Sequence, residues 1–135
     1  MGVRYLLDTN MASYVIKGNV PRVREKLVTV PMAEVGISVV TEAELRFGVA
    51  RKPGALRLAE AVEEFLVRVE VLPWDSAAAK CYSSLRATLE DAGAPMGNLD
   101  MMIAAQAFAA EAIVVTHDRV FHRVKQLKIE DWTRT

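Results

Sequence analysis

The chain has 135 residues, of which 52% are hydrophobic and 25% are charged, so we expect one domain over 1–135 with an ordinary buried core. Its 17 basic and 17 acidic residues cancel, so the net charge indicates neither nucleic acid nor an anionic membrane as a partner, and any polyanion site must be a local patch. The single cysteine, Cys81, cannot form an internal disulfide, and no run reaches the roughly 18 apolar residues of a membrane span. We therefore expect a soluble, cytoplasmic protein without a membrane partner.

The first half of the chain alternates strand-like and helical patterns. The apolar run 3–7 predicts a short buried strand, and the helix expected over 8–18 begins at Asp8, a good cap, and ends at Gly18. The patterns that follow predict a helix at 20–30, a β-rich run at 34–40, and helices at 41–52 and 54–69.

The second half continues the alternation. The patterns predict a strand at 69–73, helices at 75–93 and 97–108, a strand at 112–116 and a short helix near 119–124. Strands separated by helices indicate βαβ units. The sequence therefore predicts an α/β fold with a parallel central sheet flanked by helices on both faces.

Four acidic residues stand at distinctive places in this pattern. Asp8 directly follows the first strand, Asp118 comes shortly after the strand at 112–116, Glu44 lies in the helix after the second strand, and Asp100 opens its own helix. Ligands of open α/β sheets bind beyond the carboxyl ends of the strands, where chain geometry alone brings two of these residues. Each also has an ordinary explanation as a helix cap, a turn residue or a solvated helix residue.

Asp100 stands at the head of the run "GNLDMMIAAQAF". Ile103, Ala104 and Ala107 follow it at offsets of three, four and seven, so Asp100 belongs to the helix stripe that should face the core. A buried carboxylate is costly unless something pairs with it.

Glu44 is expected to turn inward because it shares its side of the helix with Val40, Phe47 and Gly48. The nearby Glu42 has Arg46 four residues on and is the better surface residue.

If the four carboxylates converge, their repulsion requires a cation or protonation of some of them. A pocket of hard oxygen ligands without cysteine or a histidine pair favours Mg²⁺, or Mn²⁺, over zinc. We therefore expect Asp100 to pair with a divalent metal.

Several segments in order resemble one family. They are "YLLDTN", "ISVVTEAELRFG", "LPWD", "APMGNLDMMIAAQA" and "VVTHDRVFHRV...LKIEDW". Together they resemble the PIN-domain ribonucleases, specifically the VapC toxins of VapBC toxin–antitoxin modules, over essentially the whole chain.

The resemblance implies metal-dependent endonucleolytic cleavage of RNA that leaves a 5′-phosphate and a 3′-hydroxyl, with tRNA among the substrates of such relatives. It also implies a VapB-type antitoxin and a homodimer. Carried over by position, Asp8 and Asp100 match the Mg²⁺ ligands, and Glu44 and Asp118 match the other two catalytic acidic positions. The remaining matched positions, Asn10 and Thr116, are those of polar residues that orient the ligands or the attacking water.

Some assignments stay open at this point. The segment after Thr116 reads "HD" where many relatives have two asparagines, so the role of His117, either a turn residue or a phosphate contact, is not set. Arg46 and Arg119 flank acidic positions and are candidate RNA contacts, although a solvated helix face explains them as well.

Two other classes of protein fit parts of the pattern. A haloacid-dehalogenase-type phosphomonoesterase also has an aspartate after its first strand, but it needs a second one where this chain has Asn10. An inert PIN-fold RNA-binding module would have lost acidic positions, and all four are filled here.

Overall fold

The computed structural model describes residues 2–134, so the two terminal residues of the predicted 1–135 domain lie outside the described part. Its centre is a five-stranded sheet in the order β3-β2-β1-β4-β5, with every neighbouring pair parallel. The strands are β1 (Tyr5–Leu7), β2 (Val35–Ser38), β3 (Glu70–Leu72), β4 (Ile113–Val115) and β5 (Ile129–Glu130). The predicted parallel α/β sheet is confirmed.

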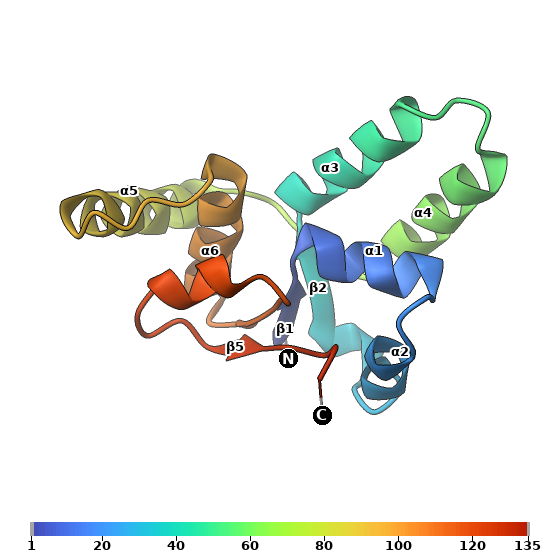
Figure 1. Cartoon of the computed structure of the whole chain (residues 1–135), viewed down its shortest axis with the longest axis horizontal. Coiled ribbons are helices and arrows are strands. Elements are labelled where there is room, and N and C mark those ends of the chain that lie inside the picture. The colour runs from blue at the N-terminus through green and yellow to red at the C-terminus, as the bar shows by residue number, and fades with distance from the viewer. Residues whose placement is uncertain (1, 135) are drawn as a thin grey trace.

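Within residues 2–134, six α-helices and two 3₁₀ helices connect the strands (Figure 1). The helices are α1 (Thr9–Lys17), α2 (Pro21–Leu27), η1 (Met32–Glu34), α3 (Val39–Ala50), α4 (Leu56–Arg68), α5 (Ser76–Asp91), α6 (Asn98–Ala110) and η2 (Arg119–Arg123). Among residues 2–134, no helix combines the length and the apolar character needed to cross a membrane.

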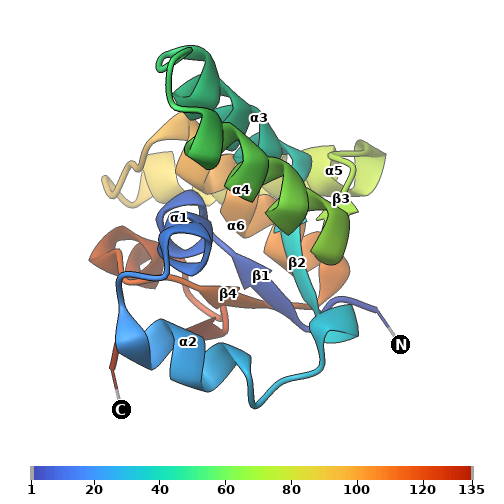
Figure 2. The same cartoon turned by 90° about the vertical axis from the view of Figure 1, so that its right-hand side faces the viewer.

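The helices cover both faces of the sheet, as predicted. Leu7 and Val115 face one side, where they pack with residues of α1 to α4, whereas Leu6 and Val114 face the other side, towards α5, α6 and η2. The turned view shows α1, α2 and α4 in front of the strands with α5 and α6 behind them (Figure 2). Alternate residues of short strands thus serve two separate cores.

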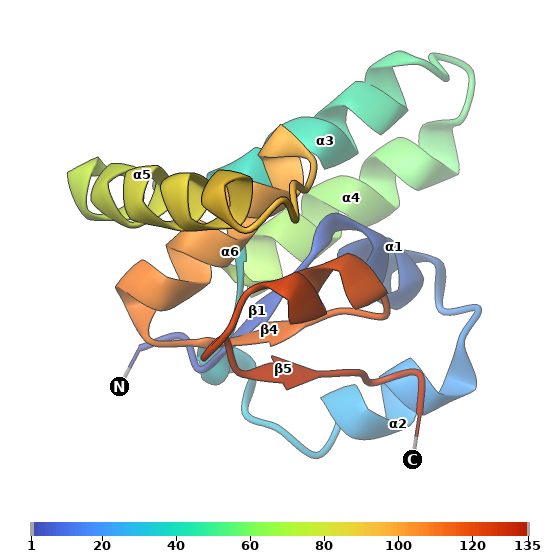
Figure 3. The same ribbon diagram turned by 60° about the vertical axis from the view of Figure 1, so that its left-hand side comes forward.

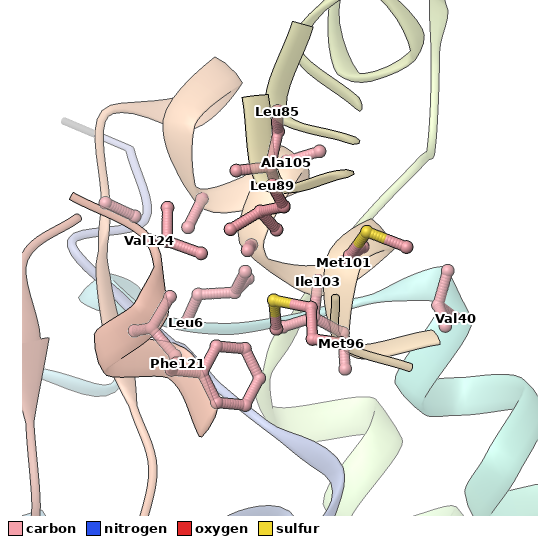
Figure 4. Packing of buried hydrophobic residues seen from close by; sticks show 14 residues of the cluster. Leu6, Val40, Leu85, Leu89, Met96, Met101, Ile103, Ala105, Phe121 and Val124 are labelled. Atoms are coloured by element: carbon pink, nitrogen blue, oxygen red, sulfur yellow. The ribbon is translucent and has the colours of Figure 1, made fainter. Parts of the chain in front are cut away.

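The core under α5 and α6 is made of small and large apolar side chains together (Figure 4). Ala104 and Ala107 are fully buried on α6, and Phe121 of η2 is fully buried beside Leu6. The small alanines let α6 approach its neighbours closely, and this packing sets the position of the helix that carries Asp100.

The helices α3 and α4 form a hairpin that extends away from the sheet (Figures 1 and 3). Helix α3 begins at Val39, two residues before the predicted start, because the Ser38 hydroxyl accepts a hydrogen bond from the Val40 amide and caps the helix. A serine cap therefore overrides the β preference of the two valines that follow it.

Candidate active site

Asp8 is fixed where β1 gives way to α1. Its amide donates to the Val115 carbonyl of β4 (3.1 Å). Its Oδ1 accepts from the Met11 amide (2.8 Å), which caps α1. Its Oδ2 accepts from the Thr116 hydroxyl (2.6 Å), and the side chain is buried. Both carboxylate oxygens are therefore aimed by the surrounding chain.

Thr116 also shapes the turn that carries Asp118. The Thr116 hydroxyl oxygen accepts from the Asp118 amide (2.9 Å), and Asp118 in turn caps η2 by accepting from the Val120 amide (2.9 Å). Thr116 is buried whereas Asp118 is exposed. One buried hydroxyl thus links the residues after the neighbouring strands β1 and β4.

Glu44 is held by a residue of α1. The Thr9 hydroxyl donates to Glu44 Oε1 (2.7 Å) and lies 3.2 Å from the Thr41 hydroxyl. Glu44 is half-buried, whereas Glu42 is paired with Arg46 (2.7 Å), as the spacing predicted.

The prediction that Phe47 faces inward together with Glu44 is wrong, because the Phe47 side chain is 61% exposed. Helix α3 extends past the end of the sheet (Figure 3), so its later turns have less to pack against. Contact with Thr9, and not a continuous apolar face, is what brings Glu44 towards the site.

Asp100 lies half-buried in the first turn of α6. Among the described residues no hydrogen bond reaches its carboxylate, whereas its helix is tied down by Gln106. The Gln106 side chain accepts from the Ser38 hydroxyl (2.9 Å) and donates to the Pro73 carbonyl (3.1 Å). This buried amide connects α6 with the ends of β2 and β3.

Burial and electrostatic repulsion between the carboxylates raise the pKa values of Asp8 and Asp100. Burial raises the pKa of Asp8 to about 6, against the opposing hydrogen bonds from Thr116 and Met11, and the charges of Asp100 and Asp118 raise it further. Burial also raises the pKa of Asp100, with added contributions from the charges of Asp118 and Glu44. Asp100 is therefore the residue whose charge connects all four predicted positions.

The donor set fits a hard cation bound partly through water. Within residues 2–134, no three Asp, Glu, His or Cys side chains lie close enough to form a ready-made cage. Mg²⁺ is commonly held by one or two carboxylates and keeps several waters. Asp8 and Asp100 could supply those carboxylates, since their oxygen atoms are the hard ligands that Mg²⁺ prefers.

The remaining predicted residues lie in different settings. Asn10 is exposed and its side chain makes no hydrogen bond to any described residue. The exposed Arg46 bridges Glu42 and Glu63 (2.7 Å each), which makes it a weaker phosphate contact. Arg119 is exposed at the start of η2, next to Asp118. His117 is a half-exposed turn residue whose Nδ1 lies 2.8 Å from Asp131 Oδ2.

Sequence reasoning missed three residues that shape the site: Thr9, Ser38 and Gln106. Thr9 follows Asp8 directly, and no sequence pattern distinguishes it from Asn10. Gln106 had a visible signal, since it is a lone amide among apolar residues that the helical pattern assigns to the core. A buried amide requires partners, and the fold provides them in Ser38 and Pro73.

Comparison with known proteins identifies the family of this chain. The PIN domain family model matches residues 5–127. The chain is 36% identical over 132 residues to the tRNA(fMet)-specific endonuclease VapC of Shigella flexneri, covering 97% of this chain and 99% of the relative. It is 30% identical over 132 residues to ribonuclease VapC2 of Rickettsia felis, covering 96% and 98%. The crystal structure of DNA-bound VapBC from Salmonella typhimurium matches with a TM-score of 0.90 and 35% identity, covering 96% of this chain and 98% of that one. The chain belongs to the PIN domain family and, within it, to the VapC ribonucleases.

Proposed function

We propose that this protein is the toxin of a toxin–antitoxin module and acts as a Mg²⁺-dependent endoribonuclease with tRNA as its substrate. The observation that carries the proposal is the electrostatic coupling of Asp100 with Asp8, Glu44 and Asp118, which makes four carboxylates from four separate segments near the carboxyl ends of the strands. The names of two relatives, both tRNA(fMet)-specific endonucleases, support tRNA as the substrate class. The filled acidic positions favour this function over an inert RNA-binding module.

In this proposal Asp8 and Asp100 hold Mg²⁺, or Mn²⁺ in its place. When bound, the ion activates water and neutralises the scissile phosphate. Thr116 keeps Asp8 Oδ2 in a single orientation through its 2.6 Å hydrogen bond. Supporting hydrogen bonds of this kind keep ligand oxygens aimed.

Glu44 and Asp118 are the proposed carboxylates that orient the attacking water and receive its proton. Thr9 occupies Glu44 Oε1 (2.7 Å) and leaves Oε2 to accept a hydrogen bond from water. The products would be a 5′-phosphate and a 3′-hydroxyl. Asn10 is exposed beside the site and remains a proposed contact for the water, and Arg119 is the proposed phosphate contact.

The test is cleavage of an initiator tRNA transcript with and without Mg²⁺. Asp100→Asn should lower the cleavage rate at least about 100-fold, because metal charge stabilisation is worth several kcal/mol. Glu42→Gln, a change to an acidic residue that faces Arg46, is the matched control and should cleave normally. A wild-type protein that binds this RNA without metal-dependent cleavage would instead be the inert binding module.

We also propose a VapB-type antitoxin and a second copy of this chain as partners, and the cytoplasm as the location where toxin and tRNA meet. Support for the antitoxin comes from related structures determined as VapBC complexes. Exposed apolar side chains on α3 and α4, among them Phe47 and Val67, offer surface for partners. Light scattering of the purified chain, alone and with the product of any small reading frame found next to its gene, tests both partners.

An antitoxin could silence the site by placing an arginine or lysine among the four carboxylates, where it would compete with Mg²⁺. Binding of an isolated antitoxin tail peptide should then weaken as Mg²⁺ rises at constant ionic strength. Inhibition that is independent of Mg²⁺ would mean that the tail covers the RNA groove instead.

A further inference from the structure

His117 occupies the tip of the turn that joins β4 to η2. The Thr116 hydroxyl on one side of it binds Asp8, and the Asp118 amide on the other side binds back to that hydroxyl. The turn is therefore closed beneath His117, and its side chain remains half-exposed.

The imidazole is held in one orientation by the residues after β5. Its Nδ1 lies 2.8 Å from Asp131 Oδ2 and 3.1 Å from the Thr133 hydroxyl. Asp131 is fixed in turn, because its Oδ1 accepts from the Thr133 amide (2.9 Å) and hydroxyl (2.6 Å), and Arg134 Nε lies 3.3 Å from Oδ2. A free surface histidine would have no such framework.

This framework also determines which ring nitrogen carries the hydrogen. Burial alone would raise the pKa of Asp131, but the hydrogen bonds from Thr133 and His117 outweigh it and lower that pKa, so the carboxylate is ionised and only accepts. The Thr133 hydroxyl gives its hydrogen to Asp131 and is an acceptor towards the ring. His117 Nδ1 therefore carries the hydrogen, and in the neutral ring Nε2 is an acceptor.

An exposed acceptor in the turn next to Asp118 selects for a particular part of a nucleic acid. Phosphate oxygens only accept hydrogen bonds, so they do not fit Nε2 of the neutral ring. The ribose 2′-hydroxyl is a donor on every nucleotide of RNA and is absent from DNA. Among the residues described, no side chain occupies Nε2.

We propose that His117 Nε2 accepts a hydrogen bond from a ribose 2′-hydroxyl next to the cleaved bond, and that Asp131 positions the ring for this contact. The inference rests on the proposed ribonuclease function and adds a means of distinguishing RNA from DNA. Because the proposed reaction uses water as the nucleophile, the 2′-hydroxyl takes no part in bond breaking. A rate lost when it is removed therefore reports recognition and not chemistry.

The test pairs protein variants with single-atom changes in the substrate. The substrate is the anticodon stem-loop of initiator tRNA, made as all-RNA and with a 2′-deoxyribose at one loop nucleotide at a time. In the wild type, one deoxy position should lower kcat/KM about 5- to 10-fold, the effect of one neutral hydrogen bond. His117→Ala should lower kcat/KM on all-RNA by a similar factor and respond less than about 2-fold to that position.

Two further variants separate recognition from general damage. His122→Ala, which removes the other histidine from the exposed surface of η2, should keep the wild-type response to the deoxy nucleotide. Asp131→Asn should lose much of the response, because an amide can donate to Nδ1 and move the ring hydrogen to Nε2. Melting temperatures of all variants check that the fold is intact.

The affinities of the same variants for the same stem-loops are measured by fluorescence anisotropy in the Asp100→Asn background. The contact is then tested even in a protein without nuclease activity. The proposal is overturned if His117→Ala keeps the full wild-type response to every deoxy position, whether or not the variant also weakens all substrates by one common factor. Absence of cleavage by the wild type, with the deoxy response intact in binding, would reject the nuclease function alone.

Discussion

Asp8 and Asp118 follow the neighbouring strands β1 and β4, whereas Glu44 and Asp100 lie on helices that meet only through tertiary packing. The strand-end pair is linked by a single threonine, Thr116, and by a backbone hydrogen bond between Asp8 and β4. The helix-borne pair depends on side chains outside the acidic set, which are Thr9 for Glu44 and Gln106 for the helix of Asp100.

The difference teaches that one half of the proposed site is fixed by the sheet, whereas the position of the other half depends on how two helices pack. Strand ends are as rigid as the ladder beneath them, whereas a helix can shift by small amounts when one buried contact is lost. Changes at the strand ends should therefore act on the electrostatics of a fixed site. Changes at the helix supports should alter the geometry of the site.

The largest expected effect is on stability, through the buried carboxylate of Asp8. Its pKa is about 6 in the folded protein against an ordinary 3.8, so the folded state binds this proton more tightly than the unfolded state. The stabilisation is fully present below pH 3.8 and is lost as the pH rises through about 6. For the metal-free protein this amounts to about 3 kcal/mol between pH 3.5 and 7.

Urea unfolding in EDTA across this pH range measures the effect. Asp8→Asn keeps an acceptor for the Met11 amide and should lack this pH dependence, so the two proteins should diverge as the pH rises. Saturating Mg²⁺ should raise the stability of the wild type at pH 7 and leave that of the variant nearly unchanged, because the variant lacks a proposed metal ligand. Parallel pH curves for both proteins would mean that folding does not raise the pKa of Asp8.

The next effect concerns the support of α6. Gln106→Leu should lower the free energy of unfolding by about 2 kcal/mol, because the buried Ser38 hydroxyl would be left without an acceptor and the Pro73 carbonyl would lose its donor. Cleavage should also fall, since α6 carries Asp100. Denaturant unfolding and cleavage assays on the same samples check this, and an active variant of normal stability would show that α6 is held by its apolar packing alone.

A smaller change in geometry should follow from Thr9→Val, which removes the hydroxyl that donates to Glu44 while keeping the shape of the side chain. We expect about a 10-fold loss of kcat, the value of one hydrogen bond to a charged group, with little change in melting temperature. Thr9→Ser retains the hydroxyl and should remain active. Equal activity of Val and Ser at this position would remove Thr9 from the support of Glu44.

The smallest effects are expected at the exposed arginines, which belong to neither pair of carboxylates. Arg119→Ala should weaken RNA binding several-fold and reduce its salt dependence by about one phosphate contact. Arg46→Ala should change RNA affinity little, because that guanidinium already bridges Glu42 and Glu63. Salt titration of RNA binding compares the two variants. A larger loss of affinity in Arg46→Ala than in Arg119→Ala would mean that the RNA contacts α3.

The sequence by itself determined the order and type of the elements and the position of each acidic residue along them. Short apolar runs indicate the strands, and local capping chemistry marks the ends of α1, where Asp8 accepts from Met11 and Gly18 adopts a left-handed φ of 65°. These features depend on neighbours within a few residues, which is why a linear pattern can carry them. The alternation of strand and helix was likewise enough to predict a parallel sheet.

Only the tertiary structure decided which polar residues support the site. Thr9 rather than Asn10 meets Glu44, Phe47 is exposed on the helix side predicted to face inward, and Gln106 anchors α6. The contacts responsible join residues 35 positions apart for Thr9 and Glu44, 68 for Ser38 and Gln106, and 108 for Asp8 and Thr116. Periodicity and propensity act over one or two turns of chain, so they cannot specify contacts that form only when distant segments pack together.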